Sequence, residues 1–375
     1  MKEKLIAFFK KETILCISGV LAVVSACIIP PDATYKGYCD IRVLTLLFCL
    51  MAVMGGLQQM GVFDRFASEL LSKAKNLRQL TTTLVMLCFF SAMLVTNDVA
   101  LITFVPFTIM LLQRANLTDR MIPFIVMQTI AANLGSMLTP VGNPQNLYLY
   151  TISGMEMGNF FATTLPYVLF SYLLLFLFSL LQGSKPLTPP KPAEQNAYDV
   201  KEKAYLLVLS VLFFLCILAV FRIIPYQAIL IAILLWFLLV QKDILKRVDY
   251  CLLLTFAFFF VLIGNLGRIP ALRETLQSLM LGREVLVSFL SCQFISNVPA
   301  AVLLSEFTDR YDLLIAGVNI GGLGTLIASM ASLISYKYFA QVPGAKKGHY
   351  LLYFTIMNVL FAAVLLGLYA FLAYR

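Results

Sequence analysis

The chain has 375 residues, of which 61% are hydrophobic and only 13% are charged, and its mean hydropathy is +0.89. Soluble domains average roughly 45–50% apolar and about 25% charged residues, so this composition excludes an ordinary soluble enzyme. The 28 basic residues exceed the 19 acidic ones, which gives a formal charge of +9. Because the basic residues lie in short segments between apolar runs, we attribute the charge to membrane topology and expect no nucleic-acid partner. The sequence therefore predicts an all-α, polytopic protein of the lipid bilayer.

Apolar runs of about 20 residues recur along the chain, and each can cross a hydrocarbon core about 30 Å thick. The first run follows a basic segment but precedes no convincing cleavage site, so we expect a retained helix rather than a signal peptide. We expect nine full crossings, at 12–30, 41–60, 121–153, 160–182, 204–221, 226–240, 249–266, 311–335 and 349–373.

Two further apolar stretches are interrupted by polar residues at their centres. The stretch 80–112 is interrupted at 96–98, and the stretch 284–307 is interrupted at 296–299. The arms on either side have about 8–16 residues, or roughly 12–24 Å, which is short for a bilayer. We therefore predict two re-entrant hairpins, each of which enters and leaves on one side of the membrane.

Nine crossings with two such hairpins place the termini on opposite faces of the membrane. Lysine and arginine concentrate on the face of the N-terminus, which the positive-inside rule assigns to the cytoplasm. We therefore expect a multi-pass protein of the plasma (inner) membrane with a cytoplasmic N-terminus and an extracytoplasmic C-terminus. The segments that carry this basic excess are 1–11, 62–78, 114–120, 183–203, 241–247 and 336–348.

A polar, proline-rich segment at 183–203 is predicted to be a cytoplasmic linker between two halves of the chain. The halves repeat one order of elements, in which Asp40 and Asp249 open equivalent helices and residues 133–136 correspond to 322–325. An odd number of crossings separates the two aspartates, so the second half should be inverted. The predicted repeats are 1–182, with hairpin 80–112 and broken helix 121–153, and 204–375, with hairpin 284–307 and broken helix 311–335.

The most polar segment inside a crossing is 132–146, which reads Ala-Asn-Leu-Gly-Ser-Met-Leu-Thr-Pro-Val-Gly-Asn-Pro-Gln-Asn. Its prolines and glycines disfavour a continuous helix, and unwound backbone at membrane depth survives only where protein or a wet cavity satisfies it. A second half-helix near Asn146 would offer N–H groups to an anion, whereas carbonyls ending the first half suit sodium. The alternative is a proline kink that packs against a neighbouring helix.

Three residues at the hairpin tips carry groups that could bind ligands. Asn97 and Asn297 are placed to cap the second arm of each hairpin, and their amides could also donate to a ligand. Asp98 follows Asn97, and a carboxylate at membrane depth costs about 2.5–3.5 kcal/mol on insertion scales and is usually functional. Asp98 could bind a proton or help to hold sodium; the alternative is a carboxylate that only stabilises the helix start.

At residues 96–100, 139–146 and 293–300 the chain resembles the ion transporter superfamily, in the branch of arsenical-pump permeases, citrate transporters and divalent-anion:sodium symporters, and within it the YbiR-like subgroup. The resemblance covers nearly all of the chain after residue 40. It implies inverted repeats, one hairpin and one broken helix per repeat, and a substrate site where the tips meet the unwound segments. It also implies a homodimer that moves a transport domain by an elevator-type motion.

The chain departs from the divalent-anion symporters at both hairpin tips. Those symporters carry Ser-Asn-Thr there, whereas Asp98 and Val298 occupy the third positions in this sequence. The second broken helix also lacks a proline and a second asparagine at 328–332, so the pattern of a second sodium site is incomplete. The Asn-Asp pair at 97–98 is more similar to the arsenical-pump permeases, and a carboxylate there disfavours a polyanionic substrate.

We therefore predict a secondary active transporter that moves a small anion, an inorganic oxyanion or a carboxylate, coupled to a proton or sodium gradient. An arsenite-type efflux permease and a sodium/proton antiporter that uses Asp98 are the alternatives, and a channel would need a continuous pore. We expect no enzymatic activity, because intramembrane hydrolysis needs a nucleophile with a base or two catalytic carboxylates. The only cofactor expected is a coupling Na⁺ or H⁺.

The predicted site residues fall into two groups. The substrate group is Thr96, Asn97, Gly142, Asn143, Asn146, Ser296, Asn297 and Thr325. The ion-coupling group is Asp98, Asn97, Thr139, Gly135 and Asn133, with sodium expected at Asn97, Asp98 and Thr139.

Overall fold

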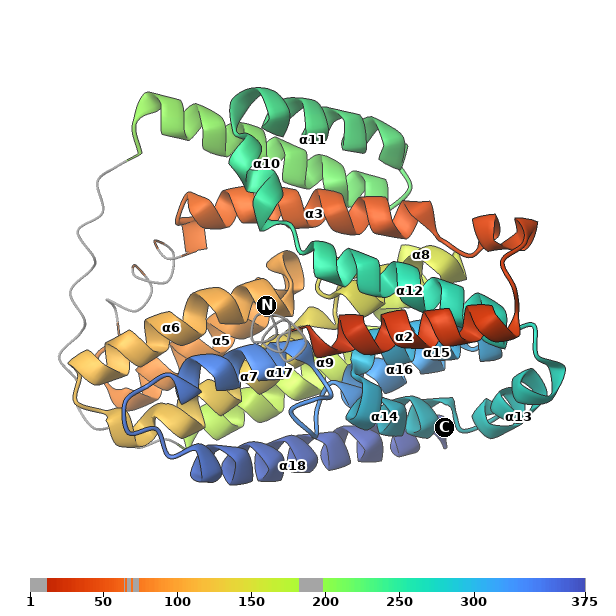
Figure 1. The fold of residues 1–375 in the computed structure, drawn as a ribbon. Helices are drawn as coiled ribbons and strands as arrows, with labels where there is room; N and C mark the ends of the chain where they lie inside the picture. The colour runs from red at the N-terminus through yellow and green to blue at the C-terminus, as the bar shows by residue number, and fades with distance from the viewer. Residues whose placement is uncertain (1–11, 64, 66–68, 70–73, 182–197, 375) are drawn as a thin grey trace.

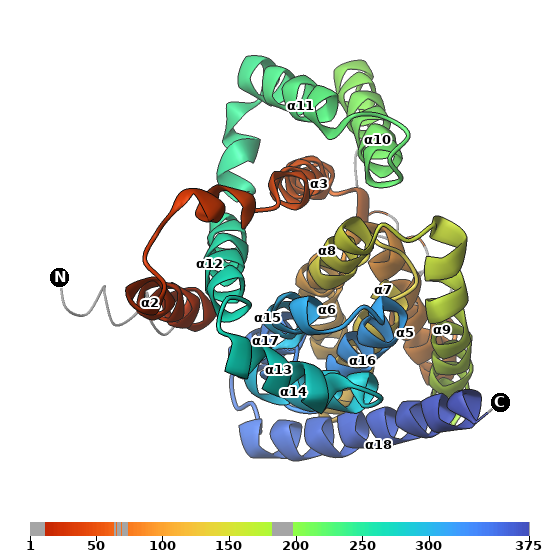
Figure 2. The same cartoon turned by 90° about the vertical axis from the view of Figure 1, so that its right-hand side faces the viewer.

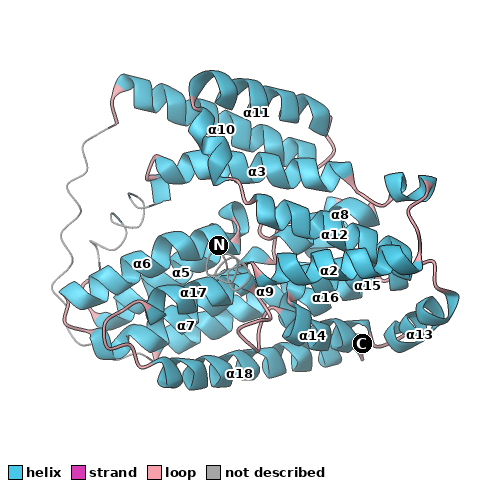
Figure 3. Ribbon diagram, in the orientation of Figure 1, coloured by secondary structure: helices cyan, strands magenta, loops and turns pink. Residues whose placement is uncertain are grey.

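The computed structural model describes residues 12–63, 65, 69, 74–181 and 198–374 (Figure 1). Within these ranges the chain forms helices joined by short loops and no strand, which confirms the predicted all-α class (Figure 3). Residues 1–11 and most of the predicted linker lie outside the described residues. The α-helices are α2 (Thr13–Ile28), α3 (Ile41–Gln59), α5 (Leu77–Val95), α6 (Asn97–Arg114), α7 (Met121–Ser136), α8 (Pro144–Ser153), α9 (Met157–Leu180), α10 (Val200–Val220), α11 (Tyr226–Val240), α12 (Tyr250–Leu266), α13 (Pro270–Met280), α14 (Glu284–Ile295), α15 (Asn297–Leu304), α16 (Tyr311–Gly321), α17 (Met330–Ala340) and α18 (Lys347–Ala373). The 3₁₀ turns are η1 (Ala33–Gly37), η2 (Thr118–Arg120), η3 (Lys242–Arg247) and η4 (Ser305–Phe307).

Many of these helices suit a membrane. Among the described residues, α3, α5, α9, α10 and α18 are each long and apolar enough to cross a bilayer. Shorter apolar helices include α2, α6, α11, α14 and α16, and α13 is bent by 105° from α12. Large apolar side chains such as Leu173, Leu235 and Ile356 are exposed on the outer helices. An apolar exterior of this kind suits lipid, so the fold is that of a polytopic membrane protein; the number of crossings stays a prediction.

Two predicted boundaries are wrong, and a helix cap explains each. The first arm of the first hairpin is α5, which has 19 residues rather than a short arm, because Asn76 accepts a hydrogen bond from the Gln79 N–H and starts the helix early. Helix α10 begins at Val200 rather than at residue 204, because Asp199 and Glu202 form a capping box. At about 1.5 Å per residue α5 is roughly 28 Å long, so length alone does not prevent it from spanning.

The helices gather into recognisable groups (Figure 2). Helices α3, α10 and α11 pack together on one side, and α2 packs along α12. The largest group contains α5 to α9 with α14 to α17, and α18 lies along its outer side. Within this group α7 lies very close to α5, since a Cβ built on Gly135 would fall 2.0 Å from the Phe89 carbonyl oxygen. A glycine is therefore required at residue 135 for this close approach.

Candidate functional site

The two hairpin tips have the same strained backbone geometry. Thr96 between α5 and α6 has φ 75° and ψ 149°, and Ser296 between α14 and α15 has φ 73° and ψ 156°. Such a positive φ is unfavourable for a residue with a side chain, and for β-branched threonine above all. The next N–H is held in the same way in both halves: Asn97 donates to the Gly142 carbonyl at 3.1 Å, and Asn297 donates to the Ala328 carbonyl at 2.9 Å. The first tip is therefore hydrogen-bonded to the break between α7 and α8, and the second tip is hydrogen-bonded to the break between α16 and α17.

The strain at the second tip predicts the effect of a substitution. Ser296→Gly should raise the free energy of unfolding by about 1 kcal/mol, because glycine adopts this conformation without the cost of a side chain. The hydroxyl of Ser296 contributes little, since its two contacts are 3.5 Å long. Thr96→Gly is the comparison variant. It relieves the same backbone strain, but it also removes the hydrogen bond that the Thr96 hydroxyl accepts from the Val99 N–H, which offsets the gain in stability. Thermal unfolding of the detergent-purified protein measures both, and a less stable Ser296→Gly variant would contradict the account.

Side-chain amides stabilise the unwound backbone at both helix breaks by hydrogen bonding. Asn143 caps α8 by accepting from the Asn146 N–H at 2.8 Å. The Asn146 amide donates to the carbonyls of Met137 and Thr139, both at 3.2 Å. In the second half the Gln293 amide donates to the carbonyls of Gly321 and Leu323, at 3.1 and 2.9 Å. These carbonyls of the unwound backbone are therefore satisfied by protein side chains, as buried polar groups require.

A buried hydrogen-bond network joins the two breaks through Asn133 on α7. The Oδ1 atom of Asn133 accepts from Asn97 Nδ2 at 3.1 Å and from Ser329 Oγ at 3.0 Å. Its Nδ2 atom donates to the Gly322 carbonyl at 3.4 Å. Asn297 lies against the same glycine, since its Nδ2 atom is 3.2 Å from a Cβ built there. The tips at Asn97 and Asn297 thus converge on Asn133 and Gly322.

Asn319 on α16, in the second half, contacts the helix break of the first half, as Asn133 in the first half contacts the break of the second. Its Oδ1 atom accepts from Asn143 Nδ2 at 3.2 Å, and its Nδ2 atom donates to Asn146 Oδ1 at 2.6 Å. Each half therefore sends one helical asparagine to the start of the second half-helix in the other half. Asn143, Asn146 and Asn319 are all buried.

The sequence reasoning missed Asn319 and Ser329 because its alignment of the halves was displaced. It matched residues 133–136 with 322–325, whereas the contacts make Asn133 equivalent to Asn319. The pattern Asn-x-Gly occurs at both positions, as Asn133-Leu-Gly135 and Asn319-Ile-Gly321, and could have given the correct register.

The side chains of two predicted residues do not face the cavity in front of the first tip. The hydroxyl of Thr139 donates to the Met93 carbonyl on α5, and Thr325 is exposed and hydrogen-bonded to Gln293. Neither residue lines the cavity in front of the first tip. Thr139 is therefore not brought together with Asp98 in that cavity, although both were expected to hold sodium.

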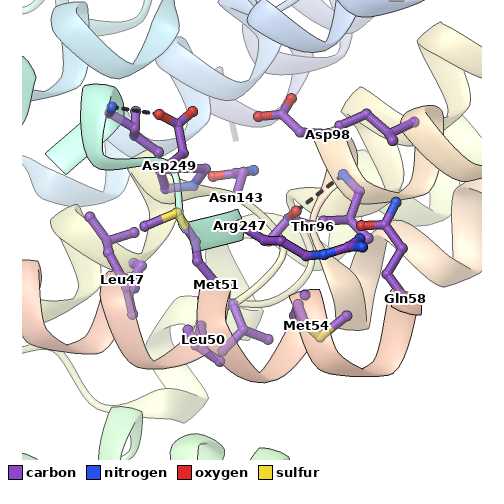
Figure 4. Close-up of a pocket in the computed structure, with 17 residues that line it drawn as sticks. Leu47, Leu50, Met51, Met54, Gln58, Thr96, Asp98, Asn143, Arg247 and Asp249 are labelled. Atoms are coloured by element: carbon purple, nitrogen blue, oxygen red, sulfur yellow. Dashed lines mark hydrogen bonds between the residues drawn. The ribbon is translucent and has the colours of Figure 1, made fainter. Parts of the chain in front are cut away.

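That cavity has a volume of about 420 Å³ and lies between α3, the first hairpin tip, the start of α8, and the junction of η3 with α12 (Figure 4). Its walls are largely apolar, and its polar groups come from the end of α3, the first tip, the start of α8 and the turn that leads into α12. The polar and ionisable side chains that line it are Gln58, Thr96, Asp98, Asn143, Arg247 and Asp249.

Two carboxylates face one another across this cavity (Figure 4). Asp249 accepts a hydrogen bond from the Leu252 N–H at 2.9 Å and so caps α12. The carboxylate of Asp98 has no hydrogen-bonded or ion-paired partner within the described part of the chain. Like charges so placed repel, so the pair favours a proton or cation between its members. The sequence identified Asp249 only as a helix start and did not identify Arg247, because only the tertiary fold brings them to Asp98.

The two hairpins, the helix breaks joined by buried asparagines, the apolar exterior and a cavity with charged side chains that opens to the surface at Arg247 and Asp249 define a polytopic membrane transporter. The chain belongs to the citrate transporter family, whose model matches residues 5–309. It is 34% identical to an uncharacterized transporter of Methanocaldococcus jannaschii over 294 residues, which are 78% of this chain and 79% of the relative. It is 29% identical to the inner membrane protein YbiR of Escherichia coli over 80% of each chain. A shorter match, 30% over 40% of this chain and 30% of the relative, is to the silicon efflux transporter LSI3 of Oryza sativa. The resemblance inferred from the sequence is thereby confirmed.

Proposed function

We propose that this transporter is secondary active and moves a small anion, with a proton or sodium ion bound at Asp98 as the coupling ion. The observation that carries the proposal is the cavity lined by the Asp98 carboxylate, which has no partner among the described residues, by the N-terminal end of α8 and by Arg247. A helix N-terminus and a guanidinium both attract anions, and a carboxylate attracts a cation. A cation bound at Asp98 would reduce the repulsion that an anion meets there, which links the two ligands.

The composition of the cavity favours a small inorganic oxyanion or its weak acid over a polycarboxylate. It holds two carboxylates and one guanidinium, so a substrate with several negative charges would meet net repulsion. One relative is named a silicon efflux transporter, which is compatible with a small inorganic solute. Efflux of an arsenite-like acid fits this class, and we keep it as a second candidate.

Sodium/proton antiport is a further candidate, and the facing carboxylates of Asp98 and Asp249 are the observation that favours it. In that case one cation at a time would occupy the pair. The anion-attracting groups at Arg247 and α8 would then have no role in transport. The main proposal uses all of these groups and is therefore preferred.

We also propose a plasma-membrane location with the N-terminus in the cytoplasm and the C-terminus outside. We further propose a homodimer, as the resemblance implies.

Two pairs of loops support the proposed topology. Thr118 and Lys346, from loops assigned to the cytoplasm, line one cavity of about 580 Å³. At the other end Arg268 and Asp32, from loops assigned to the outside, form an ion pair at 2.8 Å. Hydrogen bonds from Thr34 and Arg268 lower the pKa of Asp32 below its ordinary value, so this pair persists at neutral pH.

Uptake into proteoliposomes tests the proposed function. Purified protein would be reconstituted and supplied in turn with phosphate, sulfate, arsenate, arsenite and citrate, with an imposed proton gradient, sodium gradient or neither. We expect saturable accumulation of at least one inorganic oxyanion or its acid under one gradient only. Sodium or proton exchange without movement of any of these solutes would instead favour antiport. Solute flux that neither saturates nor depends on a gradient would indicate a channel.

A further inference from the structure

The two halves place different side chains at one equivalent position. Asp40 caps α3 by accepting from the Val43 N–H, and Asp249 caps α12 by accepting from the Leu252 N–H, both at 2.9 Å. Each cap follows a 3₁₀ turn, η1 or η3, and the second residue before each cap is Tyr38 or Arg247. Tyr38 and Arg247 are therefore counterparts in the two halves.

Tyr38 fills the space at its end of the molecule. A Cβ built on Gly264 of α12 would lie 2.5 Å from the Tyr38 ring, so the ring packs directly on the glycine. Its hydroxyl donates to Asn265 Oδ1 at 3.3 Å and accepts from Arg268 Nη1 at 3.2 Å. The aromatic ring and its polar partners therefore occupy the position that corresponds to the cavity.

Arg247 leaves the corresponding space open. Its Cβ atom is 3.6 Å from a Cβ built on Gly55 of α3, the counterpart of Gly264, and its side chain extends along the cavity (Figure 4). Within the described residues Arg247 forms no ion pair with Asp98 or Asp249. Its neighbour Lys246 pairs with Asp243 at 2.6 Å, outside the cavity. Arg247 is thus a cation that lines the cavity and forms an ion pair with none of the described carboxylates.

We propose that Arg247 binds the negative charge of the substrate and so determines charge selectivity, while Tyr38 closes the equivalent position in the other half. The inference rests on the proposed function and assigns the anion to a residue outside the hairpins and broken helices. The fork of guanidinium donors matches two oxygens of an oxyanion. Asp249, two residues along the chain, and Asp98, across the cavity, limit the charge that the cavity accepts. The ligand expected is therefore a small oxyanion with one or two negative charges.

Equilibrium binding to the detergent-purified, full-length protein tests this inference, with sulfate, phosphate and arsenate as charged probes and arsenous acid as the uncharged probe. Arg247→Gln should weaken binding of the charged probes about 10- to 100-fold, as expected for loss of a charged hydrogen-bond donor. Arg247→Lys should retain part of the affinity, because it keeps the charge without the fork. Binding of arsenous acid should change less than about threefold. The matched control is Lys242→Gln, which removes one charge from the same turn outside the cavity.

The possible results separate the inference from the proposed function. Selective loss of anion binding in Arg247→Gln, with partial recovery in Arg247→Lys, supports the inference. Wild-type anion affinity in Arg247→Gln overturns it and leaves the transporter proposal intact. Equal loss for charged and uncharged probes also overturns it, because a disturbed cavity does not discriminate by charge. If the wild-type protein binds none of the charged probes and transports none of them, both the inference and the proposed anion substrate are wrong.

Discussion

Asp98→Asn is expected to abolish accumulation of substrate against a gradient while leaving the protein folded. The substitution keeps the shape of the side chain, which caps no helix N–H among the described residues, but removes the charge that would bind the coupling ion. Loss of one charged interaction corresponds to about a 10-fold or larger effect, so net accumulation should fall at least that much. Exchange of labelled for unlabelled substrate should persist, because exchange needs binding but no driving ion. Proteoliposome uptake with imposed proton and sodium gradients measures net accumulation, and a counterflow assay measures exchange.

Asp243→Asn is the matched control for Asp98→Asn. It removes an acidic charge from η3, where Asp243 is exposed, pairs with Lys246 and does not line the cavity. Wild-type uptake is therefore expected for this control. Unchanged accumulation by Asp98→Asn under both gradients would show that Asp98 is structural. The coupling ion would then have to bind elsewhere, for example at the carbonyls of the helix breaks.

Asn133→Leu is expected to have the largest effect on stability. It would leave Asn97 Nδ2 and Ser329 Oγ without the buried acceptor that they now share. Each stranded polar group costs about 1–3 kcal/mol, so we expect the free energy of unfolding to fall by about 2–6 kcal/mol. Transport should also be lost, because Asn133 connects the first tip to the second break. Chemical or thermal unfolding in detergent, together with uptake, measures both effects.

Asn358→Leu provides the control for the same chemical change elsewhere. Asn358 is completely buried in α18, but its Nδ2 atom donates only to the Phe354 carbonyl of its own helix and its Oδ1 atom has no partner. Leucine there should change the free energy of unfolding by less than about 1 kcal/mol, since it strands no other side chain. Equal destabilisation by Asn133→Leu and Asn358→Leu would contradict a special role for the network that joins the two halves.

Local residue patterns anticipated much of the fold. Apolar runs gave the helical class, and the polar tips at Asn97 and Asn297 marked positions where one helix ends and another begins. The density of proline, glycine and amide residues around Pro140 marked the segment between α7 and α8. These features are local, because a proline or a capping side chain acts on the backbone beside it.

The groups that depend on tertiary structure could not be found in the same way. Arg247 and Asp249 belong to a turn that looks like an ordinary basic loop in the sequence, and only the packing of α3 and α12 around the first tip brings them to Asp98. Asn319 was missed because two short, weakly similar halves allow several alignments. The contacts of Asn319 with Asn143 and Asn146 select one of them.

The dependence of anion affinity on the coupling ion is the decisive measurement, because the anion and the ion are proposed to bind in one cavity. The affinity of the wild-type protein for the oxyanion that it transports would be measured by titration across pH 5–9, with and without sodium. We expect protonation or sodium to tighten anion binding at least about fivefold, and the anion to tighten binding of the coupling ion by the same factor, as linkage requires. Anion affinity that changes with neither pH nor sodium would contradict the claim that Asp98 couples the two ligands in this cavity.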